Sequence, residues 1–288
     1  MHGEPPAPRM SWTYDEESYK AYTRDTWNQS AAHYGPVLRN LDLANPALLE
    51  AARPAPGERV LDVATGPGEP ALSLARLVGP AGSVLGVDLS EAMVEIARRE
   101  AKARGLDHAR FEVMDAEALP LPEGTFDLVT CRFGLQIVTD PAKAIAETWR
   151  VLRPGGRLVA TVWGPGERCP ALHAMVEPML ELAEPDETGY LPTPYEMGGE
   201  GELVGMLREA GFREARDRRV EMTQRFEGVE AYVQAMREGT PLGHSLSEEL
   251  EDVQRRVLEK TRANAARWRT ANGALAMPAE FVVASAHK

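Results

Sequence analysis

The stretch Arg59-Val-Leu-Asp-Val-Ala-Thr-Gly-Pro-Gly-Glu-Pro-Ala71 decides the fold of this chain. Its first five residues form a short apolar run that is typical of a buried strand. Gly66 and Gly68 then mark a tight turn before a helical pattern that continues through Leu77. The two glycines and the alanine that follows match the G-x-G-x-x-G/A spacing of a strand–turn–helix unit whose backbone approaches a nucleotide-like ligand. The stretch therefore predicts a ligand-binding α/β unit.

Strand and helix patterns alternate from this unit to about residue 165. Further strand patterns lie at 83–89, 110–114, 126–133 and 158–163. Ser90 is placed to cap the helix after the second strand, and Gly105 marks the end of that helix. Asp140-Pro141 opens a later helix in the favoured order of cap and proline. Strands separated by helices predict βαβ units with right-handed crossovers, and therefore an α/β fold with a parallel sheet.

The flanking segments carry further helix and strand patterns. We predict helices at 14–34, 46–52, 171–182, 201–210, 228–237 and 245–268, and strands at 216–226 and 280–286. Ser245 and Glu248 have the spacing of a capping box for the last of these helices. The long helical insertion between the last two strands is expected to form a lid over the carboxyl edge of the sheet.

This order of elements predicts three parts. Residues 1–54 are interpreted as a tail and a helical lid segment, 55–165 as the ligand-binding core, and 166–288 as substrate-side helices with the last two strands of the sheet. The tail at 1–9 is rich in proline and lacks the apolar stretch of a signal peptide.

The composition excludes several classes of protein. A chain of 288 residues with 43% hydrophobic residues is long enough and apolar enough to bury a core. Its formal net charge of −12 has the wrong sign for a surface that binds nucleic acid. No apolar run approaches the about 20 residues that span a bilayer, and Cys131 and Cys169 lack the spacing of a metal site. We therefore expect a cytoplasmic protein with no metal, no nucleic-acid partner and no membrane span, for which a homodimer is one assembly that stays open.

The glycine turn by itself fits two kinds of ligand. A dinucleotide is one of them, because Asp88 follows the turn by about 20 residues, where a carboxylate binds ribose hydroxyls. However, Asp62 at the strand end is placed to meet an ammonium group, and Glu69 at the helix start would repel a pyrophosphate. Asp115, after the third strand, offers a polar turn for an adenine amino group. Together these residues favour a nucleoside ligand that carries a sulfonium over one that carries a pyrophosphate.

Five motifs in order give the chain a family resemblance. They are Val60-Leu-Asp-Val-Ala-Thr-Gly-Pro-Gly68, Gly86-Val-Asp-Leu-Ser-Glu-Ala-Met93, Met114-Asp-Ala-Glu-Ala-Leu-Pro120, Phe126-Asp-Leu-Val129 and Arg150-Val-Leu-Arg-Pro-Gly-Gly156. This series resembles the motifs of the class I, Rossmann-like methyltransferases that use S-adenosylmethionine, in the small-molecule branch related to the ubiquinone and menaquinone methyltransferases. Ala64 and Pro67 depart from a common glycine and from a common threonine or serine. The resemblance implies a Rossmann-like, mostly parallel seven-stranded sheet with helices on both faces and a helical lid.

The resemblance also implies where the cofactor binds. Asp88 is expected to accept hydrogen bonds from both ribose hydroxyls, and Gly66 to bring backbone against the methionine half of the cofactor. Met93 packs either on the adenine or in the core, and Arg132 lies either near the acceptor or on the surface. The predicted cofactor-binding residues are Asp62, Ala64, Gly66, Pro67, Gly68, Asp88, Leu89, Met93, Asp115, Ala116 and Arg132.

The acceptor side is predicted from aromatic residues and histidines. The expected substrate-binding residues are Trp27, Tyr34, Phe133 and Trp163, whose rings can also face the sulfonium. Methyl transfer needs a base only if the acceptor must lose a proton. His33 and His173 are the candidate catalytic residues, with His244 as a further candidate, and a structural role is the alternative for each.

The predicted function is methyl transfer from S-adenosylmethionine to an oxygen, nitrogen or carbon atom of a small-molecule acceptor by in-line displacement. Three alternatives stay open: a quinone-type C-methyltransferase, an NAD-dependent oxidoreductase, and a non-catalytic scaffold that keeps the cofactor site. The motifs do not specify the acceptor.

Overall fold

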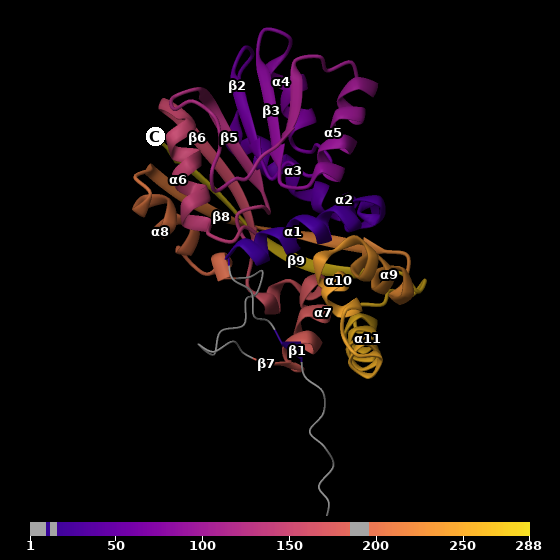
Figure 1. Ribbon diagram of the computed structural model, residues 1–288. Coiled ribbons are helices and arrows are strands. Elements are labelled where there is room, and N and C mark those ends of the chain that lie inside the picture. Colours follow the sequence, from indigo (N-terminus) through magenta and orange to yellow (C-terminus); the bar gives the residue numbers. More distant parts are fainter. Residues whose placement is uncertain (1–9, 12–15, 185–195) are drawn as a thin grey trace, which may run out of the picture.

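The structure of this chain is a computed structural model that describes residues 10–11, 16–184 and 196–288 (Figure 1). The predicted tail at 1–9 and the start of the first predicted helix at Tyr14 lie outside the described residues.

Within the described residues, seven strands form one sheet in the order β4-β3-β2-β5-β6-β9-β8. They are β2 (Arg59–Val63), β3 (Ser83–Asp88), β4 (Ala109–Val113), β5 (Phe126–Arg132), β6 (Leu152–Trp163), β8 (Arg213–Phe226) and β9 (Leu275–His287). β2 to β6 pair in parallel, and β9 runs antiparallel between β6 and β8. The predicted mostly parallel, Rossmann-like sheet is therefore confirmed. A separate two-stranded sheet joins β1 (Met10–Ser11) to β7 (Ala183–Glu184).

Helices connect the strands and cover the sheet on both sides (Figure 1). They are α1 (Glu16–Ser30), α2 (Gly35–Leu41), α3 (Asn45–Ala52), α4 (Ala71–Val78), α5 (Glu91–Ala103), α6 (Pro141–Val151), α7 (Pro170–Leu180), α8 (Glu202–Glu209), α9 (Val229–Gly239), α10 (Pro241–Ser247) and α11 (Glu251–Ala266). Two predicted caps are confirmed: Ser90 Oγ accepts a hydrogen bond from the backbone of α5, and Asp140 Oδ1 accepts one from the backbone of α6.

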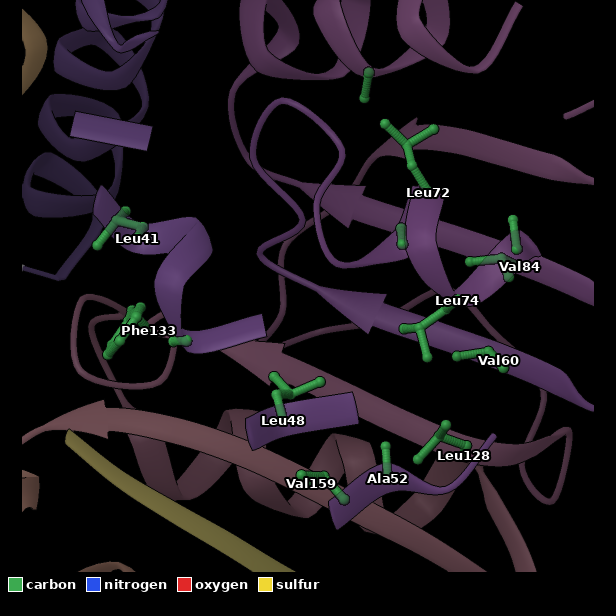
Figure 2. Packing of buried hydrophobic residues seen from close by; sticks show 14 of the residues in the cluster. Leu41, Leu48, Ala52, Val60, Leu72, Leu74, Val84, Leu128, Phe133 and Val159 are labelled. Atoms are coloured by element: carbon green, nitrogen blue, oxygen red, sulfur yellow. The ribbon is translucent and has the colours of Figure 1, made fainter. Parts of the chain in front are cut away.

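The core follows from the alternation of side chains along the strands. Val60, Leu128 and Val159 point to one face of the sheet, where they pack against α3 and α4 (Figure 2). Their neighbours Leu61 and Val129 belong to the cluster on the other face, which α6 and α8 cover. Since both faces of the sheet are buried, the central strands are nearly continuous apolar runs. This is the pattern from which they were predicted.

One predicted helix and its cap are wrong. The segment predicted as a single helix from 245 to 268 forms α10 and α11, with a break between them. Ser245 lies inside α10, where its Oγ bonds to Pro241 O and to Tyr22 Oη, so it forms no capping box with Glu248. Thr240 caps α10 instead, because its side chain accepts a hydrogen bond from Gly243 N. Helix α2, which follows the first predicted helix, was not expected.

The C-terminal helices form their own cluster beside the sheet. α7, α9 and α11 bury apolar side chains against the first half of β9, among them Met175, Tyr232 and Val257. α1 contacts α5 on one side and α10 on the other, so it lies across the carboxyl ends of the parallel strands (Figure 1). Within the described ranges no helix is both long enough and apolar enough to cross a membrane.

Candidate functional site

A cavity of about 330 Å³ opens at the carboxyl edge of the parallel strands. Its wall combines residues that follow β2 to β6 with residues of α1, α2, β8, α9 and α10. Ligands of open α/β sheets bind at this edge, because the strand ends and the helix N-termini leave polar backbone groups there. The predicted lid and the predicted cofactor turns therefore meet at one cavity.

The cofactor side of the cavity brings together most of the predicted residues. Those that line it are Ala64, Gly66, Asp88, Leu89, Met93, Asp115, Ala116 and Arg132. Asp88 Oδ2 accepts a hydrogen bond of 2.8 Å from Gly66 N, and its Oδ1 accepts one of 2.9 Å from Ser90 N. These bonds fix the carboxylate at the cavity wall. Loss of hydration raises the pKa of Asp88 above its ordinary value, although the backbone hydrogen bonds partly oppose this rise.

Asp62 is not at the cavity wall, which corrects the expectation that it meets a ligand directly. It is fully buried, and its two carboxylate oxygens accept hydrogen bonds from Thr130 at 2.6 Å and Thr65 at 2.7 Å. Burial raises the pKa of Asp62 to about 6, against the two threonine hydrogen bonds, which lower it. The carboxylate therefore ties the glycine turn to β5 from beneath.

Pro67 and Gly68 also lie behind the cavity wall. Gly68 has φ of +115°, and a Cβ at this position would stand 2.7 Å from Leu72 Cδ1. The glycine is needed for close packing of the turn on the helices rather than for contact with a ligand. Glu69 bonds to the start of α4 through Ser73, and Arg104 Nη1 lies 2.8 Å from its Oε1. Its charge is therefore partly neutralised, which weakens the argument that it repels a pyrophosphate.

Two residues with an unfavourable backbone conformation lie directly after β2 and β5. Ala64 after β2 has φ of +53°, and Phe133 after β5 has φ of +58°. This left-handed region is unfavourable for residues with a Cβ, so the surrounding packing must hold both residues in place. The residue after Phe133 is Gly134, which lies against Ala64: a Cβ at Gly134 would stand 2.4 Å from Ala64 Cβ. The replacement of a common glycine by Ala64 is thus accommodated with some strain.

Arg132 has a positioning role in this structure. Its side chain is buried, and its Nη1 donates to Asp42 Oδ1 at 2.6 Å and to Asn45 Oδ1 at 2.8 Å. These acceptors lie at the junction of α2 and α3, so the guanidinium holds that junction against the end of β5.

The four predicted substrate-side aromatic residues all line the cavity, and we call them the aromatic wall: Trp27, Tyr34, Phe133 and Trp163. Phe133 stacks on Trp163 with ring centroids 4.3 Å apart, and Trp27 meets Tyr34 edge to face at 5.5 Å. Burial raises the pKa of the Tyr34 hydroxyl, so this group stays protonated at neutral pH.

The two candidate catalytic histidines lie outside the cavity, contrary to expectation. His33 is exposed at the end of the short 3-10 turn Ala31–His33 that follows α1, and its Nδ1 lies 3.4 Å from Glu238 Oε2. His173 is on α7, where its Nε2 lies 4.0 Å from Glu177 of the next turn. His244 does not line the cavity either, and no histidine is among the described residues that do. Helical periodicity alone could not separate these positions from those that line the cavity.

The sequence reasoning missed Lys20 on α1. Its Nζ lies 2.6 Å from Glu117 Oε2 and 3.0 Å from Asp115 Oδ2, beside the turn that was predicted to bind adenine. Burial alone would lower the pKa of Lys20, but the hydrogen bonds to the two carboxylates outweigh it and raise that pKa. A signal was available, because Lys20 shares a helix face with Trp27, seven residues further on.

Comparison with known proteins places this geometry in a family. A family model described as a methyltransferase domain matches residues 60–156. The chain is 37% identical over 172 residues to the ubiquinone/menaquinone biosynthesis C-methyltransferase UbiE of Teredinibacter turnerae, a match that covers 56% of this chain and 69% of that protein. It is 49% identical over 108 residues to the demethylmenaquinone methyltransferase of Thermus thermophilus, covering 38% of this chain and 48% of that protein. The chain thus spans about half the length of the Thermus relative.

The fold has a match among solved structures as well. The YcgJ protein of Bacillus subtilis superposes with a TM-score of 0.57 at 19% identity, covering 85% of this chain and 98% of that one. This likeness concerns the fold alone. From the sheet order, the match of residues 60–156 to a methyltransferase domain and the identity to the Teredinibacter relative, we conclude that the chain belongs to the class I, Rossmann-like methyltransferases that depend on S-adenosylmethionine and is related to the quinone methyltransferases among them.

Proposed function

We propose that this protein transfers a methyl group from S-adenosylmethionine to a small molecule whose apolar body lies against the aromatic wall. One observation supports this most strongly: a single cavity is lined both by Asp88 and Asp115 and by the aromatic wall. Two ligands held in it would touch each other. Holding a nucleophile about 3 Å from the methyl group is the main contribution that a protein makes to such a displacement.

The residues on the cofactor side fit S-adenosylmethionine. Asp88 ends β3, Asp115 lies just after the neighbouring strand β4, and both offer carboxylate oxygens for the ribose hydroxyls and the adenine amino group. Leu89 and Met93 give apolar surface for the adenine ring. At Gly66, the space that a Cβ would occupy is open, so a ligand can approach the backbone there. When bound, the cofactor supplies an electrophilic methyl group on a sulfonium.

The elements above the sheet line the same cavity, and we propose that they limit the access of water to it. α1 is held from two sides, by Lys20, which pairs with Glu117 beyond β4, and by Tyr22, whose hydroxyl lies 2.5 Å from Ser245 Oγ of α10. A dry cavity favours the displacement because solvent no longer competes for the lone pair of the acceptor. The rings of Trp27 and Tyr34 are placed to stabilise a positive sulfonium.

No histidine lines the described part of the cavity, and its carboxylates lie on the cofactor side. We therefore propose that the acceptor attacks without a protein imidazole as its base. The predicted roles of His33 and His173 in catalysis have no support in the geometry.

A quinone-type C-methyltransferase is the second candidate. The Teredinibacter relative is a ubiquinone/menaquinone biosynthesis C-methyltransferase, and the Thermus relative is a demethylmenaquinone methyltransferase. The aromatic wall supports this candidate, because it offers a flat apolar surface to a ring. Mass-spectrometric location of the new methyl group, on carbon or on a heteroatom, separates this candidate from O- and N-methylation.

The proposal is tested first by calorimetry with S-adenosylhomocysteine and NAD. We expect the sulfur ligand to bind and NAD not to bind. Asp88→Ala should weaken binding at least about tenfold, since a charge-assisted hydrogen-bond acceptor contributes about 1.5–3 kcal/mol. Asp107→Ala removes an exposed carboxylate that does not line the cavity and serves as the matched control. Melting curves confirm that both variants are folded, and Asp88→Asn is the substitute if Asp88→Ala is not. Tight binding of NAD without binding of the sulfur ligand would refute the proposal.

A further inference from the structure

Gln224 occupies an unusual position in the sheet. It lies on β8, the strand at one edge, where most residues are exposed and only Ala215 and Gln224 are buried. Gln224 is 7% exposed and lines the cavity. Met222 and Phe226, two residues away on either side, share its face of the strand, because side chains alternate along a strand. A polar amide is therefore set between two apolar neighbours at the cavity wall.

Within the described residues the side-chain amide of Gln224 makes no hydrogen bond, and it is not among the fully buried unpaired groups, so it is open to the cavity. The buried polar groups around it are satisfied. Asn40 donates to Pro36 O and Arg225 O and accepts from Arg225 N, and Thr240 donates to Met236 O. An amide that makes no hydrogen bond within the protein and is reachable only from a cavity needs its hydrogen-bond partner there, because leaving such a group unpaired costs free energy. A partner is therefore expected from within the cavity.

The charges of the cavity indicate what kind of partner this is. Two cationic side chains line the described part of it, Lys20 and Arg132. Lys20 is paired with two carboxylates, and Arg132 with Asp42. Neither has its charge available for an anionic acceptor. A glutamine amide between apolar residues suits a neutral oxygen as its partner. Its NH₂ group can donate to a carbonyl oxygen, and the amide can both donate to and accept from a hydroxyl.

We propose that Gln224 determines acceptor specificity by binding a neutral carbonyl or hydroxyl oxygen on an apolar ring. This inference rests on the proposed function, because it assigns the aromatic wall and Gln224 to the same ligand. It also predicts discrimination against carboxylates and phosphates of the same ring system, because they would bring an unpaired charge into the cavity.

The experiment measures probe binding by quenching of tryptophan fluorescence, with S-adenosylhomocysteine at saturation. The probes are 2-naphthol, naphthalene and 2-naphthoate, which share a ring and differ in its substituent. We expect the protein to bind 2-naphthol at least about fivefold more tightly than naphthalene, and 2-naphthoate most weakly. Gln224→Leu should remove the preference for 2-naphthol over naphthalene. Gln234→Leu, on the exposed face of α9, is the matched control and should keep the preference.

Stability gives a second readout that does not depend on probes. Gln224→Leu should leave the melting temperature unchanged or raise it, because it removes an amide without a partner. A marked fall would show that the amide is bonded within the protein and would overturn the inference, as would a retained 2-naphthol preference in the variant or no binding of any naphthalene probe. Loss of S-adenosylhomocysteine binding in the unmodified protein would instead refute the proposed function.

Discussion

Replacement of Lys20 by methionine tests how α1 is held over the cavity. Lys20 is the group through which α1 pairs with Glu117 and Asp115, at 2.6 and 3.0 Å. Methionine keeps the length and the apolar stem of the side chain and removes the charge. The Glu117 side chain, which is 3% exposed, would then keep only the hydrogen bonds that its Oε1 accepts from the backbone of Thr139 and Asp140.

The free energy that Lys20→Met should remove from the packing of α1 lies between two limits. Removing one partner of a fully buried ion pair costs about 3–5 kcal/mol, whereas exposed pairs contribute about 0–1 kcal/mol. Lys20 is 24% exposed, so solvent screens part of the interaction, while Glu117 is almost entirely buried. We therefore expect about 2 kcal/mol, which corresponds to about a 30-fold larger equilibrium constant for opening of α1.

Amide hydrogen exchange measures this opening directly. In Lys20→Met the amides of α1 should exchange about 30-fold faster, and those of β5 should be unchanged, because the sheet does not depend on the pair. Arg24→Met is the matched control, since Arg24 lies on the same helix and, among the described residues, pairs only with its exposed neighbour Asp25. Unchanged exchange in α1, or equal effects of the two substitutions, would refute the reasoning.

Three further predictions follow from the same geometry. Gly68→Ala should lower the free energy of unfolding by about 1–3 kcal/mol, because the new Cβ would clash with Leu72. Gly57→Ala is the control and should cost less, because Gly57 also has a positive φ but a Cβ there would meet no other atom. Equal melting temperatures of the two variants would contradict the prediction. Because the pKa of Asp62 rises from 3.8 to about 6 on folding, the folded state binds the extra proton, so stability should fall as pH rises from about 4 to 6, by about 2–3 kcal/mol from this group. Urea unfolding should show that this slope is smaller in Asp62→Asn, and the same slope in both proteins would argue against it. Trp27→Ala should lower turnover at least about tenfold, about 1.4 kcal/mol in the barrier, while the calorimetric affinity for S-adenosylhomocysteine stays within a few fold; normal turnover would remove Trp27 from the acceptor site.

The parts of the fold that could be predicted are those that local patterns encode. β2 was predicted with its observed bounds because an apolar run meets a glycine turn there. The caps Ser90 and Asp140 were predicted because capping depends on a few adjacent residues. The division between α10 and α11 was not predicted: α10 contacts α1 and α11 contacts α7, and both of these partners are far away in the chain.

The same distinction between local patterns and long-range contacts applies to the candidate site. The sequence by itself determined the sheet, the carboxyl edge that carries Asp88 and the cofactor class, since motif spacing and strand periodicity are local properties. Only the tertiary structure decided which of these groups line the cavity. It buried Asp62 beneath the turn, placed His33 and His173 outside the cavity lining, and brought Lys20 and Gln224 to its wall. The physical reason is that an ion pair or an unpaired amide depends on distances between elements far apart in the chain, and no pattern within one element contains those distances.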